Sequence, residues 1–215
     1  MTPENQLGSA SQVAVLEMPA AVQSHKISYE EFIAQTNDGT WAEWVDGEVL
    51  FMTIANENCD VTFFLAALLR HFAEAHDLGR VFGEPFQMKT GPNLPGRAPD
   101  AFFVTNENLA HLKKFFFNGP ADLVIEVIST ESRSRDRGEK FYEYEEGGVR
   151  EYWLIDPQRK QAEFYQREAN GFYRAIPTTD IYHSQVLPGL WLKVAWLWQE
   201  PLPKLLSILK EWKLV

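Results

Sequence analysis

The amino-acid sequence predicts an α/β fold in which a mixed β-sheet is flanked by helices and carries additional β-hairpins. Strand-like and helix-like segments alternate along the chain, but without the strict strand–helix–strand rhythm of an all-parallel sheet. The chain has 215 residues, of which 45% are hydrophobic, and this is enough to bury one continuous core. We therefore expect a single domain over residues 25–215. Residues 1–24 are polar, small and aperiodic, which predicts a disordered tail.

In the N-terminal half, local signals predict a short helix, a hairpin and a long helix. Ser28 and Glu31 have the spacing of a capping box, which begins a helix. Two strand-like runs in residues 41–52 flank Asp46-Gly47, a dipeptide that tolerates the positive φ angles of a tight hairpin turn. Residues 56–76 are expected to form the long helix, because apolar side chains recur there at helical spacing. They are Val61, Phe64, Leu65, Leu68, Leu69 and Phe72.

Farther along the chain, apolar runs and turn residues predict short strands and helices. Residues 107–117 are expected to form a helix or a long loop, and residues 132–146 a helix that stops at Gly147-Gly148. Residues 100–105 and 122–129 are largely apolar, which indicates core strands. The other expected elements are strands at 80–82, 85–89 and 151–156, a hairpin over 160–176, a Trp-rich strand at 190–198 and a helix at 202–212.

Glu126 is the least expected residue in the strand at 122–129. The alternation of a strand puts it on the same face as Val124 and Ile128, in a run typical of a sheet covered on both faces. A carboxylate there is costly unless it is paired or binds a cation. Two interpretations stay open: a structural carboxylate that an arginine or backbone donors satisfy, and a functional one.

Asp100 begins the other core strand, directly after Pro99. Alone, such an aspartate is most often a turn or capping residue. If the strands at 100–105 and 122–129 are neighbours, however, Asp100 and Glu126 converge at one end of the sheet. Two convergent carboxylates with free coordination positions suit Mg²⁺, because this hard cation keeps waters and accepts few protein oxygens.

The segment that follows the Glu126 strand carries the densest basic cluster of the chain. Asp136, Lys140 and Tyr144 are four residues apart and share one face of the expected helix. One interpretation is a solvated helix with an Asp136–Lys140 ion pair. The other places Lys140 over the carboxylates, where it orients a water or stabilises phosphate charge. Three arginines of the cluster are candidates to bind phosphates: Arg133, Arg135 and Arg137.

Composition narrows the classes of function. The single cysteine, Cys59, excludes an internal disulfide framework and suits a reducing compartment. The longest apolar runs are too short to span a bilayer, so we expect a cytoplasmic protein without a membrane partner. The formal net charge of −10 argues against DNA binding through overall charge alone. An acidic enzyme can still bind DNA through a local basic cluster and a divalent metal.

Four groups of residues occur in an order that resembles a known family. They are Arg97-Ala98-Pro99-Asp100, Asp122 to Ser129 with Glu126, Arg135-Asp136 with Lys140 and Tyr144, and Gly148 to Pro157. This series is similar to the Uma-type family of putative restriction endonucleases, within the PD-(D/E)XK nuclease superfamily. The resemblance runs from about Ser28 to Trp198 and implies a restriction-endonuclease-like core.

The resemblance also implies Mg²⁺-dependent endonuclease activity on DNA phosphodiester bonds, with Mn²⁺ as a substitute cofactor. It makes Asp100, Glu126 and Lys140 the catalytic residues, with Asp100 and Glu126 as metal ligands and Glu43 as an additional acidic ligand. Ile128 stands where the general superfamily motif has its lysine, and Lys140 of the following helix is taken as the replacement. One chain supplies one site, so cutting both strands of DNA requires a homodimer.

Two other functions remain open. The first is a catalytically inactive nuclease-fold module that binds DNA or another protein. The acidic balance and Ile128 favour it, and the retained Asp100, Glu126 and Lys140 disfavour it. The second is a metal-dependent phosphoesterase that acts on a small substrate. A metal titration separates the inactive module from the nuclease, and activity on a generic phosphodiester but not on DNA identifies the phosphoesterase.

Overall fold

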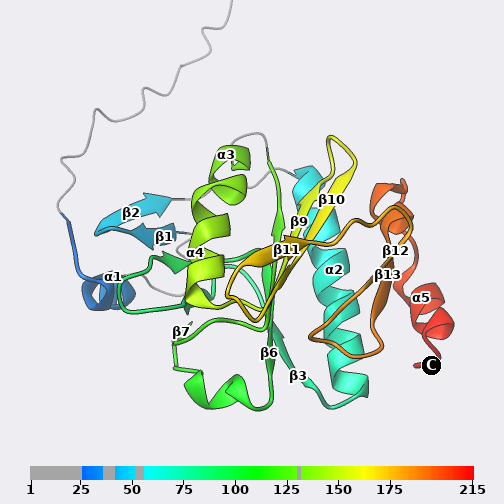
Figure 1. Cartoon of the computed structure of the whole chain (residues 1–215), viewed down its shortest axis with the longest axis horizontal. Coiled ribbons are helices and arrows are strands. Elements are labelled where there is room, and N and C mark those ends of the chain that lie inside the picture. The colour runs from blue at the N-terminus through cyan, green and yellow to red at the C-terminus, as the bar shows by residue number, and fades with distance from the viewer. Residues whose placement is uncertain (1–25, 36–41, 52–55, 130–131) are drawn as a thin grey trace, which may run out of the picture.

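The computed structural model describes residues 26–35, 42–51, 56–129 and 132–215 (Figure 1). The predicted tail over residues 1–24 lies outside the described residues. The central element is a six-stranded sheet with the order β11-β10-β9-β8-β6-β3. Only β8 and β9 are parallel among its neighbouring pairs, so the sheet is mixed, as predicted. Its strands are β3 (Gly79–Phe82), β6 (Ala101–Thr105), β8 (Leu123–Val127), β9 (Glu151–Asp156), β10 (Gln161–Arg167) and β11 (Tyr173–Ala175).

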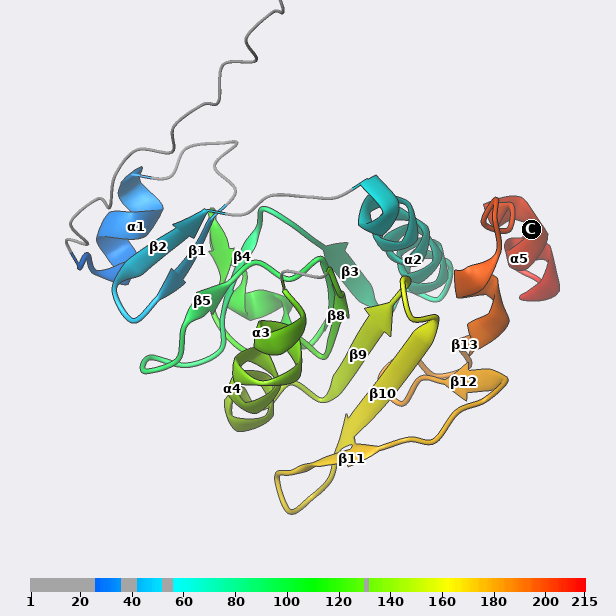
Figure 2. The same cartoon turned by 90° about the horizontal axis from the view of Figure 1, so that it is seen from above.

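Helices cover both faces of this sheet (Figure 2). Helix α2 (Asn56–Ala75) packs on one face, where Leu68 and Phe72 join Ile125 of β8 in one buried cluster. Helices α3 (Arg133–Arg137) and α4 (Glu139–Gly147) lie on the other face, where Tyr144 joins Val124 in a second cluster. Because β8 is buried on both faces, its alternating side chains are divided between the two clusters.

A second sheet lies beside α4 and has the order β2-β1-β5-β4-β7. Helix α1 (Tyr29–Gln35) precedes it, and the predicted capping box is present: the Ser28 amide donates to Glu31 Oε2 at 2.8 Å. The predicted hairpin is also present, with φ angles of 49° at Asp46 and 90° at Gly47. The strands are β1 (Ala42–Val45), β2 (Glu48–Phe51), β4 (Gln87–Lys89), β5 (Gly96–Arg97) and β7 (Phe116–Phe117).

The expected helix over residues 132–146 is broken into α3 and α4. Gly138, with φ −115° and ψ −93°, lies outside the helical region and separates them. A β-carbon at this residue would lie 2.8 Å from the Ser134 carbonyl oxygen, so the break requires glycine. Residues 107–117 form a 3₁₀ helix (Asn108–His111) followed by β7.

The Trp-rich strand expected at 190–198 is also shorter than predicted. Only β13 (Trp191–Lys193) is extended, paired with β12 (Ile181–His183), and Val194–Trp198 form a 3₁₀ helix. The pairing ends because β12 has only three residues that pair with β13. The 3₁₀ turn that follows buries Trp196 near Trp212. The final helix α5 is confirmed over Leu205–Glu211. None of the helices in the described ranges has both the length and the apolar character needed to cross a membrane.

Candidate functional site

Strand register brings three carboxylates to one end of the central sheet. In the middle of the sheet, three paired residues form a row across β3, β6 and β8: Phe82, Phe102 and Val124. All three pack in the cluster beneath α4. Two positions from this row, toward the same end of the sheet, are Glu84, which follows β3, Asp100, which precedes β6, and Glu126 of β8. Their charges interact with one another. The predicted convergence of Asp100 and Glu126 is therefore found, because β6 and β8 are adjacent and antiparallel.

Backbone and side-chain contacts fix the two predicted acidic residues. One carboxylate oxygen of Asp100, Oδ2, accepts a hydrogen bond from the Val127 amide of β8. Glu126 is only 3% exposed, and its side chain lies on the face that carries Val124 and Ile128, as the alternation predicts. Its Oε1 accepts a hydrogen bond from the Tyr144 hydroxyl at 2.7 Å.

Lys140 lies inside the acidic cluster and not on a solvated helix face. Its Nζ lies 3.0 Å from Glu126 Oε1 and 3.3 Å from Glu43 Oε1. The predicted Asp136–Lys140 ion pair is present at 3.3 Å, but both side chains are buried. Helix α4 holds Lys140 there because Tyr144, one turn farther along the same face, packs in the core beneath it.

Glu43 reaches the site from the second sheet. Arg97 Nη1 donates to Glu43 Oε2 at 2.9 Å, and Lys140 faces Glu43 Oε1, so both oxygens of this buried carboxylate face cations. Arg97 also binds both oxygens of Glu143 on α4, each at 2.7 Å. The assignment of Glu43 as an additional metal ligand stays a prediction. In this structure its contacts join the second sheet to α4.

The three arginines expected to bind phosphates differ in their surroundings. Arg133 lies 3.1 Å from Asp156 Oδ2, and Arg137 lies 2.6 Å from Glu163 Oε1 and 3.8 Å from Asp156 Oδ2. These two side chains therefore have carboxylate partners at the end of β9 and on β10. Arg135 contributes positive charge near Glu43 and Glu84. Phosphate binding by the three residues stays a prediction.

The row of carboxylates is short of positive charge. Burial, together with the neighbouring Glu126, raises the pKa of Glu84 to about 7. Burial and Glu84 raise the pKa of Asp100 to about 7. Burial raises the pKa of Glu126 to about 8; Lys140 lowers it, but nearby Asp136 and Asp100 raise it further. One ammonium is thus insufficient to neutralise the row.

Three other groups of the site have fixed protonation states. Burial alone would lower the pKa of Lys140, but Glu126 and Glu43 outweigh it and raise the pKa, so the ammonium stays charged. Burial would raise the pKa of Glu43, but Lys140 and Arg97 lower it overall, so Glu43 stays ionised. Burial and Glu126 raise the pKa of Tyr144 well above its usual value, so its hydroxyl stays protonated and donates.

These residues fit a divalent cation that takes few protein ligands. Within the described residues, no group of three or more His, Cys, Asp or Glu side chains has the arrangement of a complete metal site. Mg²⁺ needs only one or two carboxylates and keeps several waters, and Asp100 with Glu126 supplies that donor set. The raised pKa values of these two groups show the local deficit of positive charge that a divalent cation would remove.

The deficit predicts an unusual dependence of stability on pH. A carboxylate in an unfolded chain has a pKa of about 4, so between that value and about 8 the folded protein holds more protons on Glu84, Asp100 and Glu126 than the unfolded chain does. Stability falls with rising pH where the folded state binds more protons. We expect the melting temperature in EDTA to fall between pH 5.5 and 8.5. The double variant Asp100→Asn/Glu126→Gln should flatten this trend, and an equal slope in that variant would contradict the charge deficit.

Sequence reasoning gave little weight to three residues of the site. Glu84 is in the row only because β3 pairs with β6. Arg97 binds Glu43 and Glu143, which are 54 and 46 positions away in the sequence. Local spacing carries no signal for either. Tyr144 did have a signal, since it shares the helix face of Lys140, but nothing local showed that its hydroxyl reaches Glu126.

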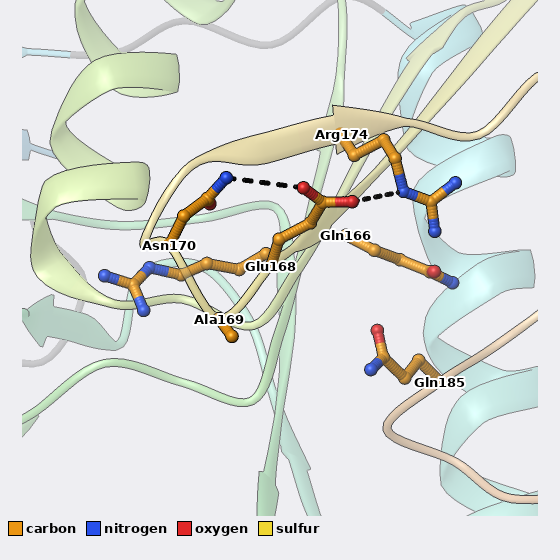
Figure 3. Close-up of a pocket in the computed structure, with 7 residues that line it drawn as sticks. Gln166, Glu168, Ala169, Asn170, Arg174 and Gln185 are labelled. Carbon is orange, nitrogen blue, oxygen red and sulfur yellow. Dashed lines mark hydrogen bonds and ion pairs between the residues drawn. The ribbon is translucent and has the colours of Figure 1, made fainter.

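The pocket in Figure 3 lies apart from this site. It is a shallow hollow on the β10–β11 hairpin, lined by Gln166, Glu168, Arg174 and Gln185 among others. Gln166 pairs with Glu151 at the start of β9, whereas Glu126 pairs with Leu154 farther along that strand. The exposed Glu168 in this pocket is bound to Arg174 at 2.7 Å.

Comparison with known proteins agrees with the predicted fold class and resemblance. The structure is similar to the crystal structure of a putative nuclease belonging to DUF820 from Anabaena variabilis. The TM-score is 0.64 at 15% sequence identity, and the match covers 80% of this chain and 97% of that one. A search of curated proteins finds no match. Residues 29–195 match the model of the Uma2 family, described as putative restriction endonucleases, and the chain therefore belongs to that family.

Proposed function

We propose that this protein is a metal-dependent endonuclease that hydrolyses DNA phosphodiester bonds. The family and the fold point to a nuclease. One observation carries the finer proposal: Asp100 and Glu126 end adjacent strands on one face, and Lys140 Nζ lies 3.0 Å from Glu126 Oε1. Two carboxylates and a charged lysine at one sheet end are the groups that metal-assisted phosphodiester hydrolysis needs.

Each residue has a distinct role in this proposal. Asp100 and Glu126 would hold Mg²⁺ or Mn²⁺, which would supply activation of a water and neutralisation of charge on the phosphate. Asp100 is held in place by the Val127 amide, so its second oxygen can face the cation. Lys140 stays charged and donates a hydrogen bond to the attacking water or to a phosphate oxygen. Since its ammonium contacts Glu43, Glu126 and Asp136, it has to release one of them to do so.

Substrate and assembly are part of the same proposal. DNA would lie across the sheet end that carries the carboxylates, with the basic residues of α3 nearest to it. Arg133 and Arg137 would have to exchange their carboxylate partners for phosphates. Cleavage of both strands would take two copies of the chain, because the described residues supply one such site.

An inactive nuclease-fold module is the second candidate. One observation favours it: Lys140 is only 2% exposed, and its ammonium already forms ion pairs with three carboxylates at 3.0 to 3.3 Å. A lysine that cannot leave these partners would keep the cluster together but could not act on a substrate. Mn²⁺ binding separates the two candidates, because a purely structural cluster has no need of the cation.

The test is cleavage of supercoiled plasmid and of single-stranded DNA in Mg²⁺, in Mn²⁺ and in EDTA. We expect nicked and linear products with either metal and none in EDTA. A chromogenic phosphodiester in parallel distinguishes a small-substrate phosphoesterase, which would cleave it and leave DNA intact. Folded protein that neither binds Mn²⁺ nor cuts any of these substrates would contradict the proposal and favour the inactive module.

A further inference from the structure

Tyr144 and Lys140 contact the same carboxylate oxygen of Glu126. The Tyr144 hydroxyl donates to Oε1 at 2.7 Å, and Lys140 Nζ lies 3.0 Å from that atom. Both donors come from α4 and are one helical turn apart, so a single helix delivers them together. Among the residues that the structure describes, no hydrogen bond reaches the other oxygen, Oε2. The two oxygens of one carboxylate are therefore differentiated by the protein.

We propose that Tyr144 is a positioning residue, which anchors Glu126 Oε1 so that Oε2 is the oxygen presented to the divalent cation. This inference rests on the proposed function, because it gives Tyr144 a role only through a cation bound by Glu126. Partners behind a metal ligand commonly fix its orientation, and their loss weakens metal binding. Tyr144 can do this because its own position is fixed: its side chain is 1% exposed and its ring meets Tyr152 edge-on at 5.3 Å between centroids.

A second tyrosine–glutamate pair in the same chain shows the purely structural arrangement. On the opposite face of the sheet, Tyr182 is also 1% exposed, and its hydroxyl donates to Glu151 Oε1 at 2.8 Å. Both oxygens of Glu151 are filled by protein donors. Oε1 also accepts from the Trp153 indole, and Oε2 accepts from Ser184 Oγ and from the amides of Gln185 and Val186.

The two pairs differ in how many carboxylate oxygens accept hydrogen bonds from the protein. A buried carboxylate that serves only the fold has its hydrogen bonds satisfied within the protein, as Glu151 does. Glu126 is 3% exposed against 0% for Glu151, yet among the described residues only its Oε1 accepts a hydrogen bond. Anchoring one oxygen while leaving the other without a protein donor is the arrangement that a metal ligand requires and that a structural carboxylate does not.

The test compares Tyr144→Phe with Tyr182→Phe, which removes the same hydroxyl from the matched pair. Mn²⁺ affinity is measured by isothermal titration calorimetry and by the electron paramagnetic resonance signal of free Mn²⁺, and thermal unfolding is followed for each variant. We expect both variants to melt at lower temperature than the wild type. Only Tyr144→Phe should bind Mn²⁺ more weakly, by about tenfold or more.

A double-mutant cycle makes the test specific to Glu126. In a Glu126→Gln background, Tyr144→Phe should have no further effect on Mn²⁺ affinity. Wild-type binding with an unchanged affinity in Tyr144→Phe, or an equal loss in Tyr182→Phe, would overturn this inference and leave the proposed function intact. Absence of Mn²⁺ binding by the wild type would instead overturn the metal site itself and the inference with it.

Discussion

Replacing Glu126 by glutamine, or Asp100 by asparagine, should reduce metal-dependent DNA cleavage by about a thousandfold. Each amide keeps the shape of the side chain but removes one of the two charges that would hold the cation. The other proposed ligand is then left to hold the cation with half of the pair's charge. Initial rates of plasmid nicking at saturating Mg²⁺ measure the effect.

The control for this prediction is Glu168→Gln, which makes the same chemical change at the exposed pocket on the β10–β11 hairpin (Figure 3). Its nicking rate should equal that of the wild type. Each variant is first shown to be folded by its cooperative thermal transition. Cleavage by Glu126→Gln at the wild-type rate would remove Glu126 from the catalytic residues.

Arg97→Met should destabilise the protein by about 3–5 kcal/mol, because removing one partner of a buried ion pair leaves an uncompensated charge. Arg97 is 1% exposed and donates three hydrogen bonds, one to Glu43 and two to Glu143. Methionine keeps much of the side-chain length, so the loss reports on charge and hydrogen bonding more than on volume. Urea denaturation measures it as a shift of the unfolding midpoint.

Arg70→Met is the matched control for that measurement. Arg70 pairs with Glu74 on the surface of α2, where the two side chains are 67% and 59% exposed. An exposed pair at this helical spacing contributes at most about 0.5 kcal/mol. If both substitutions lowered the free energy of unfolding by the same amount, the buried ion pairs of Arg97 would not contribute more to stability than an exposed pair.

Sequence patterns predicted those elements of the fold that depend mainly on residues close together in the chain. The alternation of a strand placed Glu126 on the face of Val124 and Ile128, and this holds because helices bury both faces of β8. The hairpin at Asp46-Gly47 and the capping box at Ser28 depend on neighbouring residues alone, and both are present. The alternation of strand-like and helix-like segments predicted the mixed α/β class, and the family resemblance added the expectation of a restriction-endonuclease-like core.

The rest of the site depends on contacts between distant segments. Whether Asp100 meets Glu126 depends on β6 and β8 being neighbours, and Glu84 enters the row through a third strand. Spacing along the chain does not encode these pairings, which are fixed by how the whole sheet packs. The break at Gly138 was missed because a single glycine is also tolerated inside a helix.

The site also joins the two sheets of the molecule. Glu43 comes from the second sheet, Glu126 from the first, and Lys140 touches both at 3.3 Å and 3.0 Å. The β1–β2 hairpin therefore cannot swing away from the central sheet without pulling one carboxylate off the lysine. A change of charge at Glu126 would therefore act on Lys140 and, through the contact of Lys140 with Glu43, on the way the second sheet is held.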